Sequence, residues 1–208
     1  DGLDGLAVGV SSIAAITMLA VALLTDNMAI AITMAALTGA CIGFMPYNLN
    51  PAKIFMGDTG STFLGYMLAT VSIMGLFKFY AVISFAVPFL ILGLPIFDTA
   101  NAIIRRLAEG RSPMSPDRGH VHHKLIDMGF NQKQAVAILY AISATLGLTA
   151  VVLTSSGEVK AVVLLAAVLA AILVGACIIY GAEHWGKHPQ EQKKHKNEAA
   201  QEEKNKHE

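Results

Sequence analysis

The chain has 208 residues, 54% of them hydrophobic and 14% charged, and its formal net charge at pH 7 is zero. A soluble domain usually carries about 25% charged residues, so this composition argues against an ordinary soluble protein. The balanced charge provides no basic surface for a nucleic-acid backbone, and we expect no nucleic-acid partner.

Apolar stretches of membrane-crossing length follow one another along the chain. A helix needs about 20 such residues to cross about 30 Å of hydrocarbon. Six segments come close to this length, and they are residues 6–24, 28–45, 62–77, 79–97, 135–153 and 160–180. We therefore predict an all-α fold, a polytopic membrane helix bundle of about six transmembrane helices that occupies residues 1–182.

The segments that connect these spans differ in positive charge. One side of the membrane receives only Lys78 and Lys160. The other side receives the lysines of the C-terminal tail together with Lys53, Arg105, Arg106, Arg111, Arg118, Lys124 and Lys133. By the positive-inside rule the second side faces the cytoplasm. We predict a multi-pass protein of the cell (inner) membrane with a cytoplasmic C-terminus and cytoplasmic loops, of which residues 98–134 form the longest.

Residues 183–208 are rich in Lys, Glu, Gln and His and contain few apolar side chains. Such a segment cannot bury a core. We predict a polar cytoplasmic tail that is disordered or partly helical.

The segment NLNPAKIFMGDTGSTFLG places Asp58 where a polar loop turns into the third apolar span. The free N–H groups and the positive end of a helix start can receive an anionic group such as phosphate. A carboxylate there can hold Mg²⁺, which is usually bound by one or two carboxylates together with substrate phosphates. The competing interpretation is that Asp58 only helps to cap a membrane helix.

Two further segments carry charged groups to the same predicted membrane face. DGLDGLAVG supplies Asp1 and Asp4, three residues apart, which would share one face if the segment is helical and could then attract a cation; the alternative is that they are solvated acids of a first helical turn. The loop after the fourth span holds three histidines beside Arg118, and they are His120, His122 and His123. Neutral imidazoles bind metals or transfer protons, whereas cationic ones would grip phosphate with Arg118. The alternative for this loop is a solvated cytoplasmic face.

The fourth span ends at PIFDT, which contains Asp98. Arg105 and Arg106 follow about two helical turns later, and we expect Asp98 to pair with an arginine and fix the helix position. The carboxylates, the Gly-rich turn and the His/Arg loop all converge on one interface. This convergence predicts a site where a water-soluble anionic substrate meets a group held in the lipid, with Mg²⁺ neutralising phosphate charge.

With the motifs DGLDGLA, NLNPAKIFMGDTGS, PIFDT and GHVHHKL, the sequence resembles the bacterial polyprenyl-phosphate N-acetylhexosamine-1-phosphate transferases, of the glycosyltransferase family 4 type. The HVHH pattern makes it more similar to the undecaprenyl-phosphate GlcNAc-1-phosphate transferases than to the phospho-MurNAc-pentapeptide transferase of peptidoglycan synthesis, which usually has consecutive histidines. The former initiate the assembly of O-antigen, common antigen or wall teichoic acid.

The resemblance implies a reaction and its partners. The phosphate of undecaprenyl phosphate attacks the β-phosphorus of UDP-GlcNAc, which gives undecaprenyl-diphospho-GlcNAc and releases UMP. Mg²⁺ is the implied cofactor, with Mn²⁺ as an alternative. The partners are the UDP-sugar, undecaprenyl phosphate and membrane lipid, and a homodimer is left open.

By the position of the motifs, the resemblance also implies roles for individual residues. Asp58 would be the metal ligand, and Asp1 and Asp4 would lie at the nucleotide-sugar site. Asn48 and Phe55 would contact the uridine, Phe55 by stacking on the uracil. The remaining implied residues would hold the diphosphate or orient the lipid phosphate, and they are Arg118, His120, His122 and His123.

The resemblance covers the C-terminal part of the family's pattern. Its members have about eleven spans and an upstream loop with paired aspartates, which has no counterpart here. We therefore expect the chain to be a fragment that is inactive by itself. The alternatives from other classes are a membrane transporter and a structural membrane scaffold. A transporter predicts ionisable residues near the centres of the spans, whereas the charges here gather at one interface.

Overall fold

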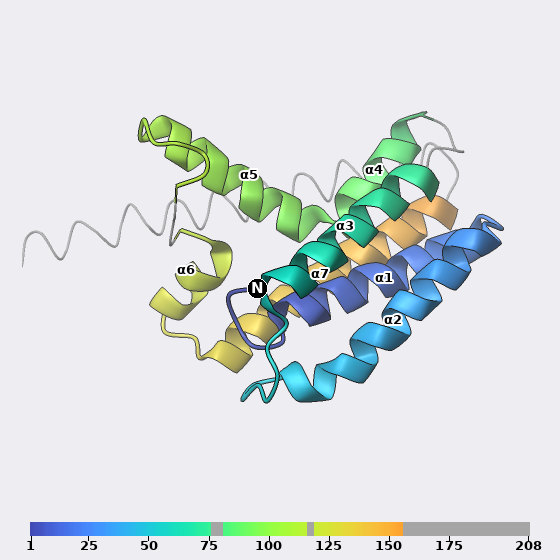
Figure 1. The fold of residues 1–208 in the computed structure, drawn as a ribbon. Coiled ribbons are helices and arrows are strands. Elements are labelled where there is room, and N and C mark those ends of the chain that lie inside the picture. The colour runs from blue at the N-terminus through green and yellow to red at the C-terminus, as the bar shows by residue number, and fades with distance from the viewer. Residues whose placement is uncertain (76–80, 116–118, 156–208) are drawn as a thin grey trace, which may run out of the picture. The chain divides into compact units, whose positions relative to one another are not determined.

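The computed structural model describes residues 1–75, 81–115 and 119–155, and every regular element among them is an α-helix (Figure 1). The elements are α1 (Leu6–Leu24), α2 (Met28–Asn48), α3 (Gly57–Gly75), α4 (Ala81–Ile91), α5 (Gly93–Ala108), α6 (Val121–Asp127) and α7 (Gln132–Ser155). The predicted all-α fold is thereby confirmed for this part of the chain. The predicted span 160–180 and the tail 183–208 lie outside the described residues.

Three of the described helices, α1, α2 and α7, are long and apolar enough to cross a membrane. They coincide with the predicted spans 6–24, 28–45 and 135–153. The third predicted span falls on α3, whose first turns carry Asp58, Thr59, Ser61 and Thr62 and are therefore much more polar than the rest of the helix.

The fourth predicted span, residues 79–97, is not one continuous helix, and this expectation was wrong. α4 ends at Ile91, and α5 begins at Gly93 after Leu92. The reason is Pro95, which has no N–H to donate to the carbonyl of Ile91 and whose ring would clash with that carbonyl. Pro95 is tolerated in the first turn of α5, where its N–H would have no helical partner. The break also starts a new helix that runs well into the segment predicted as a loop.

The centre of the bundle is α1, which contacts α2, α3, α4 and α7. Its buried residues include Val8, Ala15, Met18 and Val21, each at most 2% exposed. α1 and α7 approach closely, because a Cβ added to Gly9 would lie 2.0 Å from the Tyr140 ring. Small residues at such crossings let membrane helices gain van der Waals contact that lipid alone does not provide.

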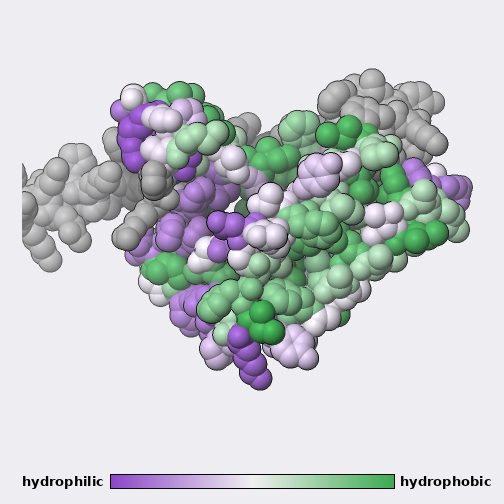
Figure 2. Space-filling model, viewed as in Figure 1, coloured by the Kyte–Doolittle hydropathy of each residue, from purple (hydrophilic) through white to green (hydrophobic). Residues whose placement is uncertain are grey.

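Large apolar side chains remain on the outside of the bundle. Ile32 on α2 is 70% exposed, and Leu148 on α7 is 66% exposed. On the face shown in Figure 2, hydrophobic residues spread over the helices of the bundle, whereas hydrophilic residues gather near the N-terminus, near α6 and at the far end of α5. An apolar exterior of this kind suits a lipid environment, because the hydrocarbon solvates it without the cost of water contact.

The first residues of α1, α3 and α7 and the last residue of α2 lie toward the same end of the bundle (Figure 1). The hydrogen bonds agree, since the Gly5 N–H donates to the Asn48 side chain at 3.2 Å and Asn50 donates to Gln132 at 2.9 Å. Segments that are far apart in sequence therefore meet at one end, where the candidate site lies.

Candidate active site

A cavity of about 950 Å³ opens among α1, α3, α5, α6 and the helix pair α4 and α7. One part of its wall is apolar and includes Leu6, Val10, Ala14, Leu68, Ile91, Ile103 and Leu139. The polar part includes Asp1, Ser61, Asp98, His120, His122 and His123. The same cavity could thus hold a long apolar group against its apolar wall and an anionic head against its polar wall.

Asp98 and His120 form the best-defined polar contact of the cavity. Asp98 Oδ2 lies 2.8 Å from His120 Nδ1, and Asp98 Oδ1 accepts the backbone N–H of Val121 at 2.9 Å. The prediction that Asp98 pairs with an arginine was wrong. Among the described residues, its carboxylate contacts the His120 ring and accepts the Val121 N–H instead. A carboxylate at this distance holds the imidazole ring in a fixed orientation.

His122 and His123 continue from His120 on the first turn of α6. The ring of His122 stacks on that of His120 with centroids 5.9 Å apart, and it lies 4.2 Å from the ring of His123. Burial, followed by the nearby charge of His123, lowers the pKa of His122 to about 4. His122 is therefore neutral at neutral pH, and a cationic triad that grips phosphate with all three rings is not available.

Asp4 anchors the loop between α2 and α3. Its Oδ2 accepts from the Asn50 side-chain amide at 3.0 Å and from the Ala52 backbone N–H at 3.1 Å. The same Asn50 amide donates to Gln132 at the start of α7. One side chain thus connects the beginnings of α1 and α7 to the loop that carries Phe55.

Asn48 also stabilises this loop through hydrogen bonds. It is 2% exposed, accepts from the Gly5 N–H at 3.2 Å and donates to the Ile54 carbonyl at 2.9 Å. Phe55, by contrast, is 75% exposed on the loop. Of the two residues implied for uridine contact, Phe55 has a free aromatic surface and Asn48 shapes the backbone next to it.

Asp58 lies in the first turn of α3 and is exposed. Among the described residues, no hydrogen bond or ion pair occupies its carboxylate, while the Ser61 hydroxyl, one turn later, donates to the Asp58 carbonyl at 3.3 Å. Ser61 itself lines the cavity. Asp58 itself is not among the residues that line the cavity, and within the described residues both of its side-chain oxygens are available.

These residues fit a divalent cation only in company with a ligand. In the part of the chain that the structure describes, no group of three or more His, Cys, Asp or Glu side chains comes together as a preformed metal site. Mg²⁺ completes its shell with waters and substrate phosphates, so one available carboxylate such as Asp58 suffices for it. A cation held entirely by protein ligands would require a cluster that the described residues do not form.

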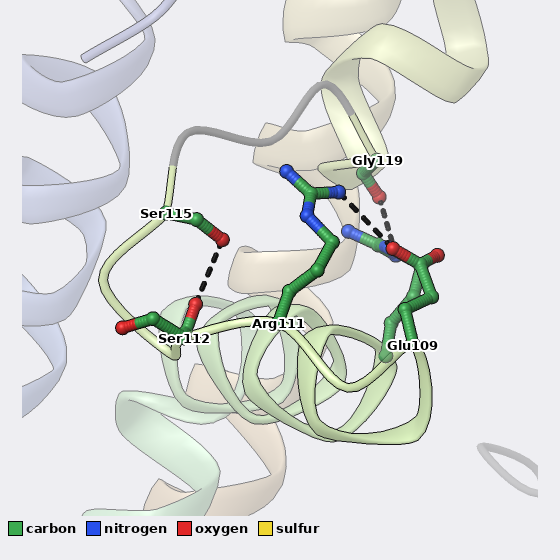
Figure 3. Close-up of polar contacts among 6 residues, drawn as sticks. Glu109, Arg111, Ser112, Ser115 and Gly119 are labelled. Carbon is green, nitrogen blue, oxygen red and sulfur yellow. Dashed lines mark hydrogen bonds and ion pairs between the residues drawn. The ribbon is translucent and has the colours of Figure 1, made fainter.

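Arg118 lies outside the described residues. The loop that leads toward it is ordered by local contacts, which Figure 3 shows: Arg111 pairs with Glu109 at 3.0 Å, and the Ser115 hydroxyl donates to the Ser112 carbonyl at 2.7 Å. After residues 116–118, Gly119 accepts a hydrogen bond from Arg105 at 3.1 Å. The backbone next to His120 is thereby drawn against α5.

The structure brings Asp1 and the three histidines to one cavity and uses Asp4 and Asn48 to support the neighbouring loop. Asp58 does not line this cavity, although Ser61, one turn later on α3, does. Sequence reasoning missed Asn50 and Gln132. Asn50 stands in the same NLNP motif as Asn48 and could have been found there, whereas a single polar residue at the start of an apolar span gives no signal for Gln132.

Residues 1–76 match the protein family described as glycosyl transferase family 4. A probable undecaprenyl-phosphate N-acetylglucosaminyl 1-phosphate transferase of Bacillus subtilis is 42% identical over 156 residues, which cover 75% of this chain and 44% of that protein. A decaprenyl-phosphate N-acetylglucosaminephosphotransferase of Mycolicibacterium smegmatis is 40% identical over 162 residues, which cover 67% of this chain and 39% of that protein.

A third relative is the undecaprenyl-phosphate alpha-N-acetylglucosaminyl 1-phosphate transferase of Escherichia coli O157:H7. It is 31% identical over 183 residues, which cover 86% of this chain and 50% of that protein. The chain thus spans half or less of the length of these curated relatives.

Proposed function

This chain belongs to glycosyl transferase family 4 through its first 76 residues, and from that premise we propose that the protein carrying it transfers GlcNAc 1-phosphate from UDP-GlcNAc to undecaprenyl phosphate. The reaction releases UMP and begins the assembly of a cell-envelope polymer. The family resemblance inferred from the motifs is confirmed. The donor, the acceptor and the activity are proposals for this protein.

The observation that carries the proposal is the two-sided cavity. Its polar wall joins Asp1 to His120, His122 and His123, and its other wall is aliphatic. A UDP-sugar is soluble and anionic, whereas a polyprenyl phosphate has an anionic head on a long apolar chain. The polar wall would receive the phosphates, and the aliphatic wall would receive the first isoprene units of the lipid.

We propose individual roles from the positions of the motifs, supported by the contacts of the described residues. Phe55 would stack on the uracil, and Asp4 with Asn48 would hold the loop that presents it. Asp1 and His120 would face the reacting phosphates, and Arg118 would add positive charge to them. Asp58 would hold Mg²⁺ together with phosphate oxygens, and the cation would supply neutralisation of the diphosphate charge.

The membrane placement is also part of the proposal. In addition to α1, α2 and α7, we propose that α3 crosses the bilayer, and that α4 crosses it together with the apolar start of α5, because α4 alone has 11 residues and is too short. The cavity and the polar loops then lie on the cytoplasmic side. The distribution of Lys and Arg supports this orientation. UDP-sugars and the charged headgroup would then meet at the inner leaflet.

The decisive experiment follows transfer of radiolabelled GlcNAc phosphate to lipid and release of UMP in membranes that contain the whole protein that carries this chain, since the chain is expected to be inactive by itself. The wild type should show both, and Asp58→Asn should lose both while inserting normally. Thr59→Ala, next to Asp58 and without a carboxylate to lose, is the matched control. Unchanged turnover in Asp58→Asn would contradict the role of Asp58, and a wild type without product would contradict the transferase.

A further inference from the structure

One carboxylate of α5 ties down the beginning of α6. Asp98 Oδ1 accepts the Val121 N–H at 2.9 Å, and Asp98 Oδ2 meets His120 Nδ1 at 2.8 Å. His120, the residue that precedes α6, has no side-chain hydrogen bond to cap the helix. Asp98 therefore supplies from a neighbouring helix the acceptor that a local cap would provide, and it orients the His120 ring at the same time.

A second contact fixes the same segment against α5. Arg105 lies seven residues after Asp98, so both side chains share one face of the helix, and Arg105 donates to the Gly119 carbonyl at 3.1 Å. A Cβ added to Gly119 would lie 2.1 Å from Arg105 Cζ, so the backbone before His120 passes directly over the guanidinium. Two residues of α5, Asp98 and Arg105, thus fix the position of His120 relative to this helix.

The three histidines of the cavity are not equivalent. The Nε2 of His122 is buried and has no hydrogen-bond partner within the described part of the chain, and a Cβ added to Gly2 would lie 2.5 Å from it, so this ring is packed against the N-terminal segment. Among the described residues, His120 is the histidine that has a carboxylate partner. His120 and Asp98 are partly exposed, with 29% and 25% of their side chains accessible, and both line the cavity.

We propose that Asp98 is a positioning residue for His120, holding the ring with its proton on Nδ1 so that Nε2 is the nitrogen presented to the phosphate groups of the substrate. Nδ1 donates to the carboxylate, which leaves Nε2 as an acceptor on the neutral ring and as a donor on the charged ring. This inference rests on the proposed function, because it assigns roles to two residues of the same site.

The alternative is that Asp98 is only a cap for α6, and Asp98→Asn separates the two. The amide oxygen of Asn can still accept the Val121 N–H, so the cap is kept. Its NH₂ group would face Nδ1 and favour the other tautomer of the ring, with the proton on Nε2. We expect kcat to fall roughly ten- to hundredfold with KM for the UDP-sugar changed less than about twofold. The unfolding temperature should stay near that of the wild type.

A double-mutant cycle tests whether Asp98 acts through His120. His120→Gln should lower kcat at least as far as Asp98→Asn, and adding Asp98→Asn to it should change kcat by less than about twofold. Asp26→Asn removes a carboxylate from the turn between α1 and α2, whose left-handed backbone Asn tolerates, and should leave kcat unchanged. Losses that multiply in the double variant would overturn the inference.

A second readout does not depend on turnover. The ¹⁵N resonances of His120, assigned by their disappearance in His120→Gln, report which ring nitrogen carries the proton. We expect Nδ1–H in the wild type and Nε2–H in Asp98→Asn. The same tautomer in both proteins would overturn the inference. A wild type that makes no product would remove the proposed function, and the tautomer measurement would still decide whether Asp98 positions the ring.

Discussion

The carboxylate of Asp4 accepts a hydrogen bond from the side-chain amide of Asn50 at 3.0 Å across 46 positions of sequence. The Asn50 amide also reaches Gln132 at 2.9 Å. The loop between α2 and α3 is therefore anchored to the beginnings of α1 and α7, and the exposed ring of Phe55 projects from an anchored backbone.

Replacing Asn50 should loosen this loop. In Asn50→Ala we expect the free energy of unfolding to fall by about 1–2 kcal/mol, because two half-buried acceptors, on Asp4 and Gln132, lose their donor. KM for the UDP-sugar should rise severalfold as the loop that carries Phe55 becomes less ordered. Thermal unfolding in detergent and initial rates measure the two effects.

Asn27→Ala is the matched control for Asn50→Ala. Asn27 caps α2 at the opposite end of the bundle, where it accepts from the Ile30 N–H at 3.5 Å. Loss of this cap should cost about 0.5–2 kcal/mol while KM stays at the wild-type value. Equal changes of KM in both variants would show that the effect of Asn50 is one of general stability.

Phe55 provides a test of nucleotide contact. Its side chain is 75% exposed. Exposure of an aromatic ring to water is unfavourable, and a nucleotide base that covers the ring would remove this cost. Stacking of a base on an aromatic ring contributes about 1–3 kcal/mol, so Phe55→Ala should weaken binding of UDP roughly five- to hundredfold. Phe55→Tyr should retain most of the affinity.

Phe63 on α3 provides the matched control, because Phe63→Ala also removes an exposed aromatic ring but at a place where no base is expected to stack. Phe63 is 55% exposed, and Phe63→Ala should leave UDP affinity unchanged in a calorimetric titration. If Phe55→Ala binds UDP as tightly as Phe63→Ala, the uracil does not lie on Phe55.

Much of the helical framework could be predicted from residue patterns, because a bilayer demands long apolar segments and their ends are marked by polar residues. Hydropathy located α1, α2 and α7 within a few residues. It failed at Pro95, since an apolar run looks the same to a hydropathy window whether or not a proline breaks its hydrogen bonds.

The candidate site could be predicted only as a set of residue types. Asp1, the histidines and Asp58 carry chemistry that is recognisable from their motifs. Which carboxylate partners which group depends on how helices far apart in sequence pack. Asp98 therefore turned from an expected arginine partner into the partner of His120, and Asp4 became a loop anchor through Asn50, whose role no local pattern announces.

The close approach of α1 and α7 predicts a strong difference between two glycines. A Cβ at Gly9 would lie 2.0 Å from the Tyr140 ring, so Gly9→Ala should destabilise the protein by about 1–3 kcal/mol through overpacking. No described residue has an atom within 4 Å of a Cβ at Gly39 on α2, so Gly39→Ala should be neutral or slightly stabilising. Thermal unfolding in detergent compares them, and equal unfolding temperatures would contradict the α1–α7 packing.

The burial of His122 predicts how stability depends on pH. Burial and the neighbouring His123 lower the pKa of His122 from 6.5 to about 4, so the folded protein binds this proton less readily than the unfolded chain does. The contribution to stability is complete above pH 6.5 and is lost as the pH falls toward 4. Because the ring is only about half buried, we expect a loss of about 1–2 kcal/mol across this window.

His122→Gln cannot take up the proton, so its unfolding temperature should fall less than that of the wild type between pH 7 and pH 4.5. Parallel pH profiles for the two proteins would show that His122 is not held in its neutral form.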